Sequence, residues 1–589
     1  MTTATLHAST AQGRRVSAVR SELAVPLATG ALAALLFLPF LGAPGLFDPW
    51  ETHYAEVARQ MLVRGDWVHP YWQNAYFFSK PPLIMWLMLP GLWASGAQQA
   101  GATMPAGVEW LVRLPFAALA IGGVAFLSFA VARLTSRRVG LVFGAVLSTM
   151  SLYGLLARQA MTDMPFVVLV SAAVACAMLA RRSERGRARW WLAAGVLLGL
   201  STLAKGFVGV LLVAGTAAVA LAWGAVELPA AARRAAIVAA LAEVRVAAVA
   251  CALVAAPWFL AMASFTGLDE ERRTFVDRFF VYDHLQRLFS GVHTTTPDGT
   301  FTYFIEQLGY ATFPWALLLP GALAAGASVP ERWRPTWRVL AVWAALGFAG
   351  ISLSATKFHH YVFIMLPPIA ALMALFVDRV LEDGVRGREL PLALGALAAV
   401  LVGHDLGVRP RHWLDLFVYN QARPYPEALA QGVQPGLTAL LAVTLLGAAG
   451  LLVLRRRGAA FGLTLVAALA GSAWLGWVHW PAMGAAWTQR ELFARYFSLR
   501  APGEPIAAFL MNWKGETFYS RNEVVQLLPG ATPQALGEAT QLFVNRLGRK
   551  WVLVEHPRLE VLRQAVGPGH AFAPVDPGLN HKFVLVRID

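Results

Sequence analysis

Long apolar runs recur along most of this chain and constrain its fold more than any other feature. About thirteen of them are long enough, or nearly so, to cross about 30 Å of hydrocarbon as a helix of roughly 20 residues. They lie near residues 24–43, 109–132, 139–157, 164–180, 190–204, 207–225, 245–265, 308–328, 338–354, 361–377, 389–404, 436–454 and 461–480. Only 14% of the residues are charged, against about 25% in soluble domains. The composition therefore excludes a water-soluble enzyme and predicts an α-helical polytopic membrane protein.

Arginines gather in short groups in every second connection between these runs. The groups are Arg14, Arg15 and Arg20; Arg133, Arg137 and Arg138; Arg181, Arg182, Arg185, Arg187 and Arg189; Arg233 and Arg234; Arg332, Arg334 and Arg338; Arg379, Arg386 and Arg388; and Arg455, Arg456 and Arg457. Because cytoplasmic loops carry an excess of Lys and Arg, the N-terminus is predicted to be cytoplasmic. An odd number of spans then places the C-terminus outside. The first run lacks a small-residue cleavage site, so no cleavable signal peptide is expected.

The opposite face carries longer and less apolar segments, at residues 44–108, 266–307 and 405–435. From residue 482 onward the composition becomes that of a small soluble domain. Its expected elements are strands at 505–511, 542–546, 550–555 and 582–588 and a helix near 557–566. We therefore expect a transmembrane domain over 1–481 and a small extracytoplasmic α/β domain over 482–589.

Two further stretches are expected to lie along the membrane interface. Residues 83–98 are apolar but are followed at once by another span, so they are expected to lie along the surface. A helix over 49–64 is expected to turn Trp50, Tyr54 and Met61 toward the bilayer edge.

Ionisable residues lie at the outward-facing ends of the runs, where a charge is costly to bury. They are Glu51, Asp163, Lys205, Asp283, His284, Arg287, Lys357, His359 and His360, followed by Tyr361. Carboxylates, imidazoles and cations gathered on one face predict a site that binds an anion and moves a proton. Structural roles compete with this interpretation, namely helix capping for Asp48, Glu51 and Asp163, and anchoring at the interface for the lysines and Tyr361.

Six short motifs follow one another in order on this predicted face. They are Asp48–Arg59, Phe77-Phe78-Ser79-Lys80-Pro81-Pro82, Met161-Thr162-Asp163-Met164-Pro165, Leu203-Ala204-Lys205-Gly206-Phe207, Asp283-His284-Leu285-Gln286-Arg287 and Lys357-Phe358-His359-His360-Tyr361. From about residue 44 to 370 the chain resembles the membrane-embedded GT-C transferases that use polyprenyl-phosphate-linked sugars. The aminoarabinose transferases that modify lipid A and the protein O-mannosyltransferases of glycosyltransferase family 39 are of this kind.

This resemblance implies a GT-C fold and transfer of a hexosyl or pentosyl group from a polyprenyl-phosphate-linked donor. The acceptor would be lipid A, another glycan or a protein, at the outer face of a bacterial inner membrane, with no role for nucleic acid. Negative charge grows on the leaving lipid phosphate, and fixed cations stabilise it. The candidate phosphate-binding residues are Lys80, Lys205, His284, Arg287, Lys357 and Tyr361.

The general base is less clearly marked. The pattern of the class at the first motif, Pro-Asp-Glu-Thr-Arg-Tyr-Ala-Glu, here reads Pro49-Trp50-Glu51-Thr52-His53-Tyr54-Ala55-Glu56. Trp50 thus stands in place of the principal acid. Glu51 is expected to serve as base in an inverting displacement, with Asp48 as the alternative and Asp163 orienting the acceptor.

No cofactor follows from the sequence. Ser79 stands where some relatives place a metal-binding acid, which leaves His284 as the candidate ligand for a divalent metal. The two cysteines, Cys176 and Cys251, lie in apolar runs and form neither a disulfide framework nor a metal cluster. A transporter or flippase of the same lipid-linked sugar, and a non-catalytic binding protein, are the rival hypotheses, and the sugar and the acceptor are left open.

Overall fold

The computed structural model describes residues 22–99, 103–290, 301–417, 423–528, 533–546 and 548–589. Nine helices within these residues are long and apolar enough to cross a membrane. They are α4 (Val108–Leu134), α7 (Asp163–Arg182), α9 (Val208–Val226), α10 (Ala230–Ala263), α14 (Arg334–Leu353), α15 (Leu366–Asp383), α16 (Glu389–Val408), α17 (Glu427–Val453) and α18 (Arg457–Trp474). A helix bonds its backbone polar groups internally, which hydrocarbon requires. The chain is a multi-pass membrane protein.

Each of the other four predicted spans also corresponds to helical structure. The first is the helix Glu22–Phe37, the third is divided into α5 (Arg137–Thr149) and α6 (Ser151–Leu156), and the fifth is α8 (Arg187–Lys205). The eighth begins with α12 (Phe301–Thr312) and is bent by 115° against Trp315–Ala327. The count of thirteen spans therefore stays a prediction, and the first arginine group, Arg14 to Arg20, lies outside the described residues.

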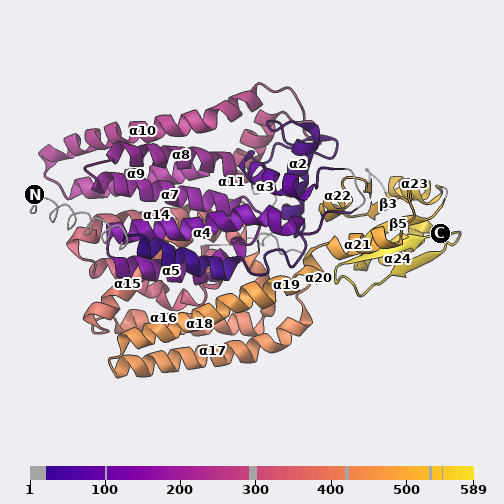
Figure 1. Ribbon diagram of the computed structural model, residues 1–589. Coiled ribbons are helices and arrows are strands. Elements are labelled where there is room, and N and C mark those ends of the chain that lie inside the picture. Colours follow the sequence, from indigo (N-terminus) through magenta and orange to yellow (C-terminus); the bar gives the residue numbers. More distant parts are fainter. Residues whose placement is uncertain (1–21, 100–102, 291–300, 418–422, 529–532, 547) are drawn as a thin grey trace, which may run out of the picture.

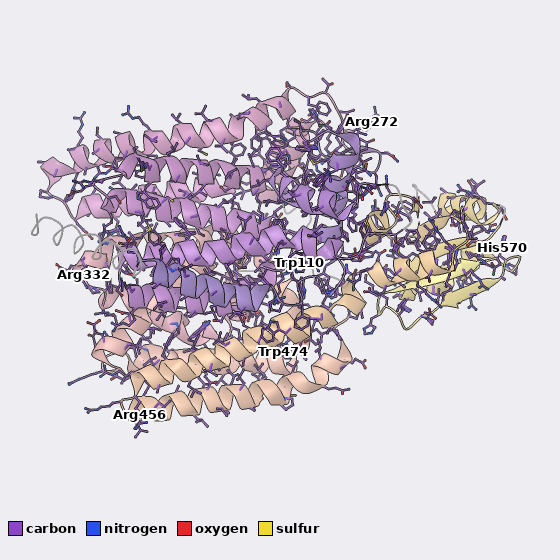
Figure 2. The ribbon with its side chains drawn as sticks, in the orientation of Figure 1. Trp110, Arg272, Arg332, Arg456, Trp474 and His570 are labelled. Atoms are coloured by element: carbon purple, nitrogen blue, oxygen red, sulfur yellow. The ribbon has the colours of Figure 1, made fainter. Side chains whose placement is uncertain are left out.

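The long helices run side by side in one bundle (Figure 1). The apolar stretches of α7 and α15 are 89% and 94% buried, whereas those of α10 and α17 are 17% and 11% buried. The first two helices therefore form the interior of the bundle, and the last two face outward. Figure 2 places Arg332 and Arg456 at one end of the bundle, and the terminal domain with His570 beyond the other end.

Shorter helical elements connect these parts. They are η1 (Val276–Gln286), α11 (Arg287–Phe289), η2 (Trp315–Leu318), α13 (Leu319–Ala324), η3 (Ala325–Ala327), η4 (Glu331–Trp333), η5 (His359–Met365), η6 (Pro410–Leu416), η7 (Leu475–His479), α19 (Trp480–Ala482), α20 (Gly484–Trp487) and α21 (Arg490–Leu499). Strands β1 (Tyr71–Trp72) and β2 (Ala75–Tyr76) form a small antiparallel hairpin.

Two helices cover the end of the bundle that faces the terminal domain. α3 (Leu83–Ser95) is too short to cross hydrocarbon, as expected for residues 83–98. α2 (Trp50–Arg64) ends at Gly65, whose left-handed φ of 65° closes the helix. The expected exposure of α2 to the bilayer is wrong, because Tyr54 and Met61 are buried at 2% and 0% exposure and α2 packs against α22 of the terminal domain.

The terminal domain is a five-stranded mixed sheet with helices against it (Figure 1). Its strands are β3 (Ile506–Phe509), β4 (Val525–Leu527), β5 (Lys550–Glu555), β6 (Phe572–Val575) and β7 (Phe583–Ile588), in the order β4-β3-β5-β7-β6. β3 pairs in parallel with β4 and β5, and β7 pairs antiparallel with β5 and β6. Its helices are α22 (Gly515–Tyr519), α23 (Pro533–Val544) and α24 (Leu559–Val566).

One predicted strand of this domain, at residues 542–546, is wrong. The segment contains the end of α23, and Phe543 and Val544 are buried in the core beneath the sheet together with Leu536. A short apolar run fits a helix face as well as a strand, and here the helix prevails. The expected strands at 550–555 and 582–588 are present.

Buried polar contacts join the terminal domain to the bundle. Gln489 Nε2 donates to Asp48 Oδ2 and to Glu516 Oε2, both at 2.9 Å. A Cβ atom on Gly515 would lie 2.3 Å from Asp48 Oδ1, so only glycine allows this close approach. The first turn of α22 is thereby fixed against the start of α2.

Candidate functional site

A cavity of about 520 Å³ lies where the bundle meets the terminal domain. Its walls come from α2, the segment around the β1–β2 hairpin, the ends of α7 and α8, η1, η5 and the loop before α22. The candidate catalytic and phosphate-binding residues that line it are Lys80, Asp163, Lys205, Arg287 and Tyr361, and Asp283 and His360 from the same predicted face line it as well. Five candidate side chains from distant parts of the chain thus share one cavity. Among the elements around it, α2 and α22 lie at the end of the bundle next to the terminal domain (Figure 1).

Asp163 and Lys205 form an ion pair in the cavity wall. Asp163 is the first residue of α7 and Lys205 the last of α8, where the helix dipoles favour an acid and a base respectively. Lys205 Nζ lies 2.6 Å from Asp163 Oδ1, and Thr162 Oγ1 lies 3.1 Å from Asp163 Oδ2. The ammonium also lies 5.5 Å from the ring centre of Tyr361. The acid therefore orients the cation toward the cavity.

Two guanidinium groups, one from the π-helix η1 and one from the first residue of α11, share a carboxylate of η1. Arg287 Nη2 donates to Asp283 Oδ1 at 2.9 Å, and Arg278 Nε lies 3.2 Å from Asp283 Oδ2. The Nε of Arg287 is buried and has no hydrogen-bond partner among the described residues. An anion in the cavity could accept from it, because a guanidinium offers several donors in one plane.

Lys80 adds a cation to the same region. Its Nζ donates to the carbonyl of Ser79 at 3.1 Å, and among the described residues no carboxylate forms an ion pair with it. Burial lowers the pKa of Lys80 to about 8, and Arg287 and Lys205 contribute in the same direction. Because an anion relieves the mutual repulsion of such cations, an anion bound at this part of the wall would be stabilised.

An aromatic and imidazole wall faces these cations. Trp50, His53 and Tyr54 line the cavity from one face of α2, and Trp72 lines it from β1. Lys514 enters from the loop before α22, with its Nζ 3.9 Å from the centre of the Trp72 ring. Sequence reasoning did not assign His53, Arg278 or Lys514 to the site. For His53 the signal was its i, i+3 spacing from Trp50, whereas nothing in the sequence marked Lys514.

Glu51 does not line the cavity, which corrects its expected place there. Its carboxylate accepts from Arg113 Nη2 at 2.6 Å, Arg113 Nε at 2.9 Å, and the backbone N–H groups of Ala160 and Phe47, each at 2.8 Å. Glu51 and Arg113 are 1% and 0% exposed. Four donors thus occupy a carboxylate that faces away from the cavity, and they give it a structural role.

Asp48 is also outside the cavity lining. Thr52 Oγ1 donates to its Oδ1 at 3.0 Å, in addition to the bond from Gln489. It does not cap α2, whose N-cap is Pro49 with no side-chain hydrogen bond. Burial raises the pKa of Asp48 well above its ordinary value. Asp48 therefore belongs to the junction between the two parts of the protein.

His284 and Lys357 likewise do not line the cavity. His284 Nδ1 lies 2.7 Å from the carbonyl oxygen of Phe279, and its ring packs against Gly206. Lys357 Nζ donates to the carbonyl of Ser354 at 2.6 Å. One polar atom of each side chain is thus bonded to the protein backbone, and their expected role in binding phosphate stays a prediction.

The residues present do not fit a divalent metal. Within the described part of the chain no three His, Cys, Asp or Glu side chains are grouped to hold one. At Ser79, Arg278 Nε donates to the hydroxyl at 3.2 Å, so a guanidinium occupies the neighbourhood where a metal would have to bind.

The chain has a GT-C-like fold, the fold of a solved membrane-embedded transferase. The structure of ArnT from Cupriavidus metallidurans bound to undecaprenyl phosphate has the same fold, with a TM-score of 0.71 over 95% of this chain and 97% of that chain at 21% identity. The family of dolichyl-phosphate-mannose-protein mannosyltransferases matches residues 79–260. The resemblance found in the sequence is thereby confirmed.

Two named enzymes are similar to this chain in sequence. The undecaprenyl phosphate-alpha-4-amino-4-deoxy-L-arabinose arabinosyl transferase of Pectobacterium carotovorum is 29% identical over 63% of this chain and 63% of its own length. The enzyme of the same name, numbered 1, from Pseudomonas fluorescens strain Pf0-1 is 28% identical over 61% and 58%. The match spans less than two thirds of either relative.

Proposed function

We propose that this protein is a glycosyltransferase that moves a sugar from a polyprenyl-phosphate-linked donor to an acceptor at the surface of a bacterial inner membrane. The observation that carries the proposal is the meeting of Lys80, Lys205 and Arg287 in one cavity. The fold shared with ArnT and the donor in the relatives' names support it.

The cavity wall matches the charge that such a reaction develops. As the bond between the sugar and the phosphate oxygen breaks, negative charge grows on the lipid phosphate. Arg287 donates through planar N–H groups, whereas Lys205 and Lys80 act as compact charges. Asp163 keeps Lys205 in place through its 2.6 Å contact. Cations that are already oriented stabilise the leaving group without reorganisation.

The experiment uses the full-length protein in lipid vesicles with undecaprenyl phosphate carrying labelled 4-amino-4-deoxy-L-arabinose or mannose. Membranes from cells that lack this protein supply the acceptor. We expect release of undecaprenyl phosphate and transfer of label to a membrane component. Movement of intact donor across the vesicle without cleavage would support the flippase alternative, and binding without either reaction would support a non-catalytic protein.

We also propose that the cavity and the terminal domain lie outside the cytoplasm. The arginine groups represented by Arg332 and Arg456 lie at the opposite end of the bundle (Figure 2), and such groups mark the cytoplasmic side. Single cysteines placed at His570 and Arg456 in a variant lacking Cys176 and Cys251 test this. A membrane-impermeant thiol reagent applied to intact spheroplasts should label the first and spare the second, and the reverse pattern would contradict the proposal.

A further inference from the structure

His53 is a buried imidazole in the cavity wall with neither nitrogen bonded. It lines the cavity and is 7% exposed, and neither Nδ1 nor Nε2 has a hydrogen-bond partner among the described residues. The ring lies between aromatic neighbours, 4.6 Å from Trp72 and 4.8 Å from Phe77, measured between ring centres. Buried polar groups are generally paired. Both nitrogens are buried, so a rotation of the ring in the cavity wall would bring an unpaired nitrogen to a group that enters.

The helix geometry of α2 explains why His53, and not Glu51, is available here. Neighbouring residues on a helix point about 100° apart, whereas residues three or four apart share a face. Trp50 lines the cavity but has no basic atom. His53, three residues further on, lines the same cavity, while Glu51 points toward Arg113.

The charges around His53 keep it neutral and therefore able to accept a proton. Burial lowers the pKa of His53 well below its ordinary value, and the nearby cations Lys514, Lys80 and Arg278 lower it further. These cations come from the loop before α22, the segment before α3, and η1. A lipid phosphate bound at Lys80 would offset part of this positive charge. Donor binding would thus raise the proton affinity of the imidazole when the reaction needs it.

We propose that His53 is the general base that activates a hydroxyl group of the acceptor, an inference that rests on the proposed function. The imidazole nitrogen takes the proton of the hydroxyl while its oxygen forms a bond to the anomeric carbon of the sugar. The bond from that carbon to the phosphate oxygen breaks, and its electron pair leaves with the polyprenyl phosphate. The imidazolium then returns its proton to solvent.

The test compares His53→Asn with His69→Asn in the full-length protein in vesicles, using the labelled donors and acceptor membranes described above. His69 lies outside the cavity lining and pairs with Asp66, with Nδ1 3.0 Å from Oδ2, so it is a matched control. General-base catalysis contributes about 10²–10⁴-fold. His53→Asn should lose transfer by a factor in that range while its affinity for undecaprenyl phosphate changes less than about threefold.

Three further readouts separate a base from a structural residue. The rate of wild-type transfer should fall at acid pH as His53 becomes protonated, and His53→Asn should lack this fall. Added imidazole should restore part of the activity of His53→Ala. If His53→Asn transfers sugar at a rate close to that of His69→Asn, the inference is overturned. An acceptor group that is already ionised, such as a phosphate, needs no base and would give this result. Parallel loss of donor binding would also overturn it. If the wild type itself transfers no sugar, the proposed function fails and this inference fails with it.

Discussion

Replacing Arg113 by Ala is expected to destabilise the protein strongly, by about 3–5 kcal/mol, because it leaves a buried carboxylate without its charge partner. Arg113 Nη2 lies 2.6 Å from Glu51 Oε2, and both side chains are buried. Arg113 also donates to the carbonyls of Leu41, Pro44 and Gly45, so the chain entering α2 loosens with it. The midpoint of thermal unfolding in detergent measures the effect.

Arg187→Ala is the matched control for this loss. Arg187 forms a 3.1 Å contact with Glu243, but its side chain is 47% exposed, and exposed pairs contribute about 0–1 kcal/mol. Glu51→Gln separates the structural role of Glu51 from the catalytic one. We expect it to destabilise the protein but to keep transfer per folded molecule, whereas a base would lose transfer without loss of stability. An Arg113→Ala protein as stable as Arg187→Ala would contradict the structural role.

Removing a cation from the cavity is expected to impair transfer severely. Loss of one preorganised donor to a developing negative charge costs about 10²–10³-fold in rate. Arg287→Ala and Lys205→Ala should each lower kcat/KM for the lipid-linked sugar to that extent, with weaker binding of undecaprenyl phosphate. Arg187→Ala, which lies outside the cavity lining, should bind and transfer as the wild type does, and equal losses in all three variants would contradict the site.

The pH dependence of kcat/KM for the same reaction tests whether the charge of Lys80 is needed. Its pKa is lowered to about 8, so the side chain is charged below that pH and loses its charge as the pH rises through it. Because kcat/KM reports the free enzyme, kcat/KM should fall above about pH 8 in the wild type. Lys80→Met should have a lower kcat/KM than the wild type at every pH below about 8 and should lack this fall. An unchanged alkaline profile in Lys80→Met would assign the fall to another group.

The sequence by itself determined the class of fold and half of the site. Apolar length and arginine spacing predict spans and their direction, because hydrocarbon admits only helices that satisfy their own backbone. Lys205 and Asp163 could be predicted because each lies at the outward end of a span. A charge there is costly to bury and therefore indicates a functional site. The strands at 550–555 and 582–588 could likewise be predicted, since a short continuous apolar run is a local signal of a buried strand.

Tertiary structure alone decided which polar side chains face the cavity. Glu51 and His53 are two residues apart and both are polar, yet packing turns one to Arg113 and the other into the cavity. A sequence shows neither the rotation of α2 about its axis nor the distant partner at residue 113. Lys514 reaches the cavity only because the terminal domain docks on α2 through Gln489 and Asp48. Such contacts join residues hundreds of positions apart, and only the folded chain brings them together.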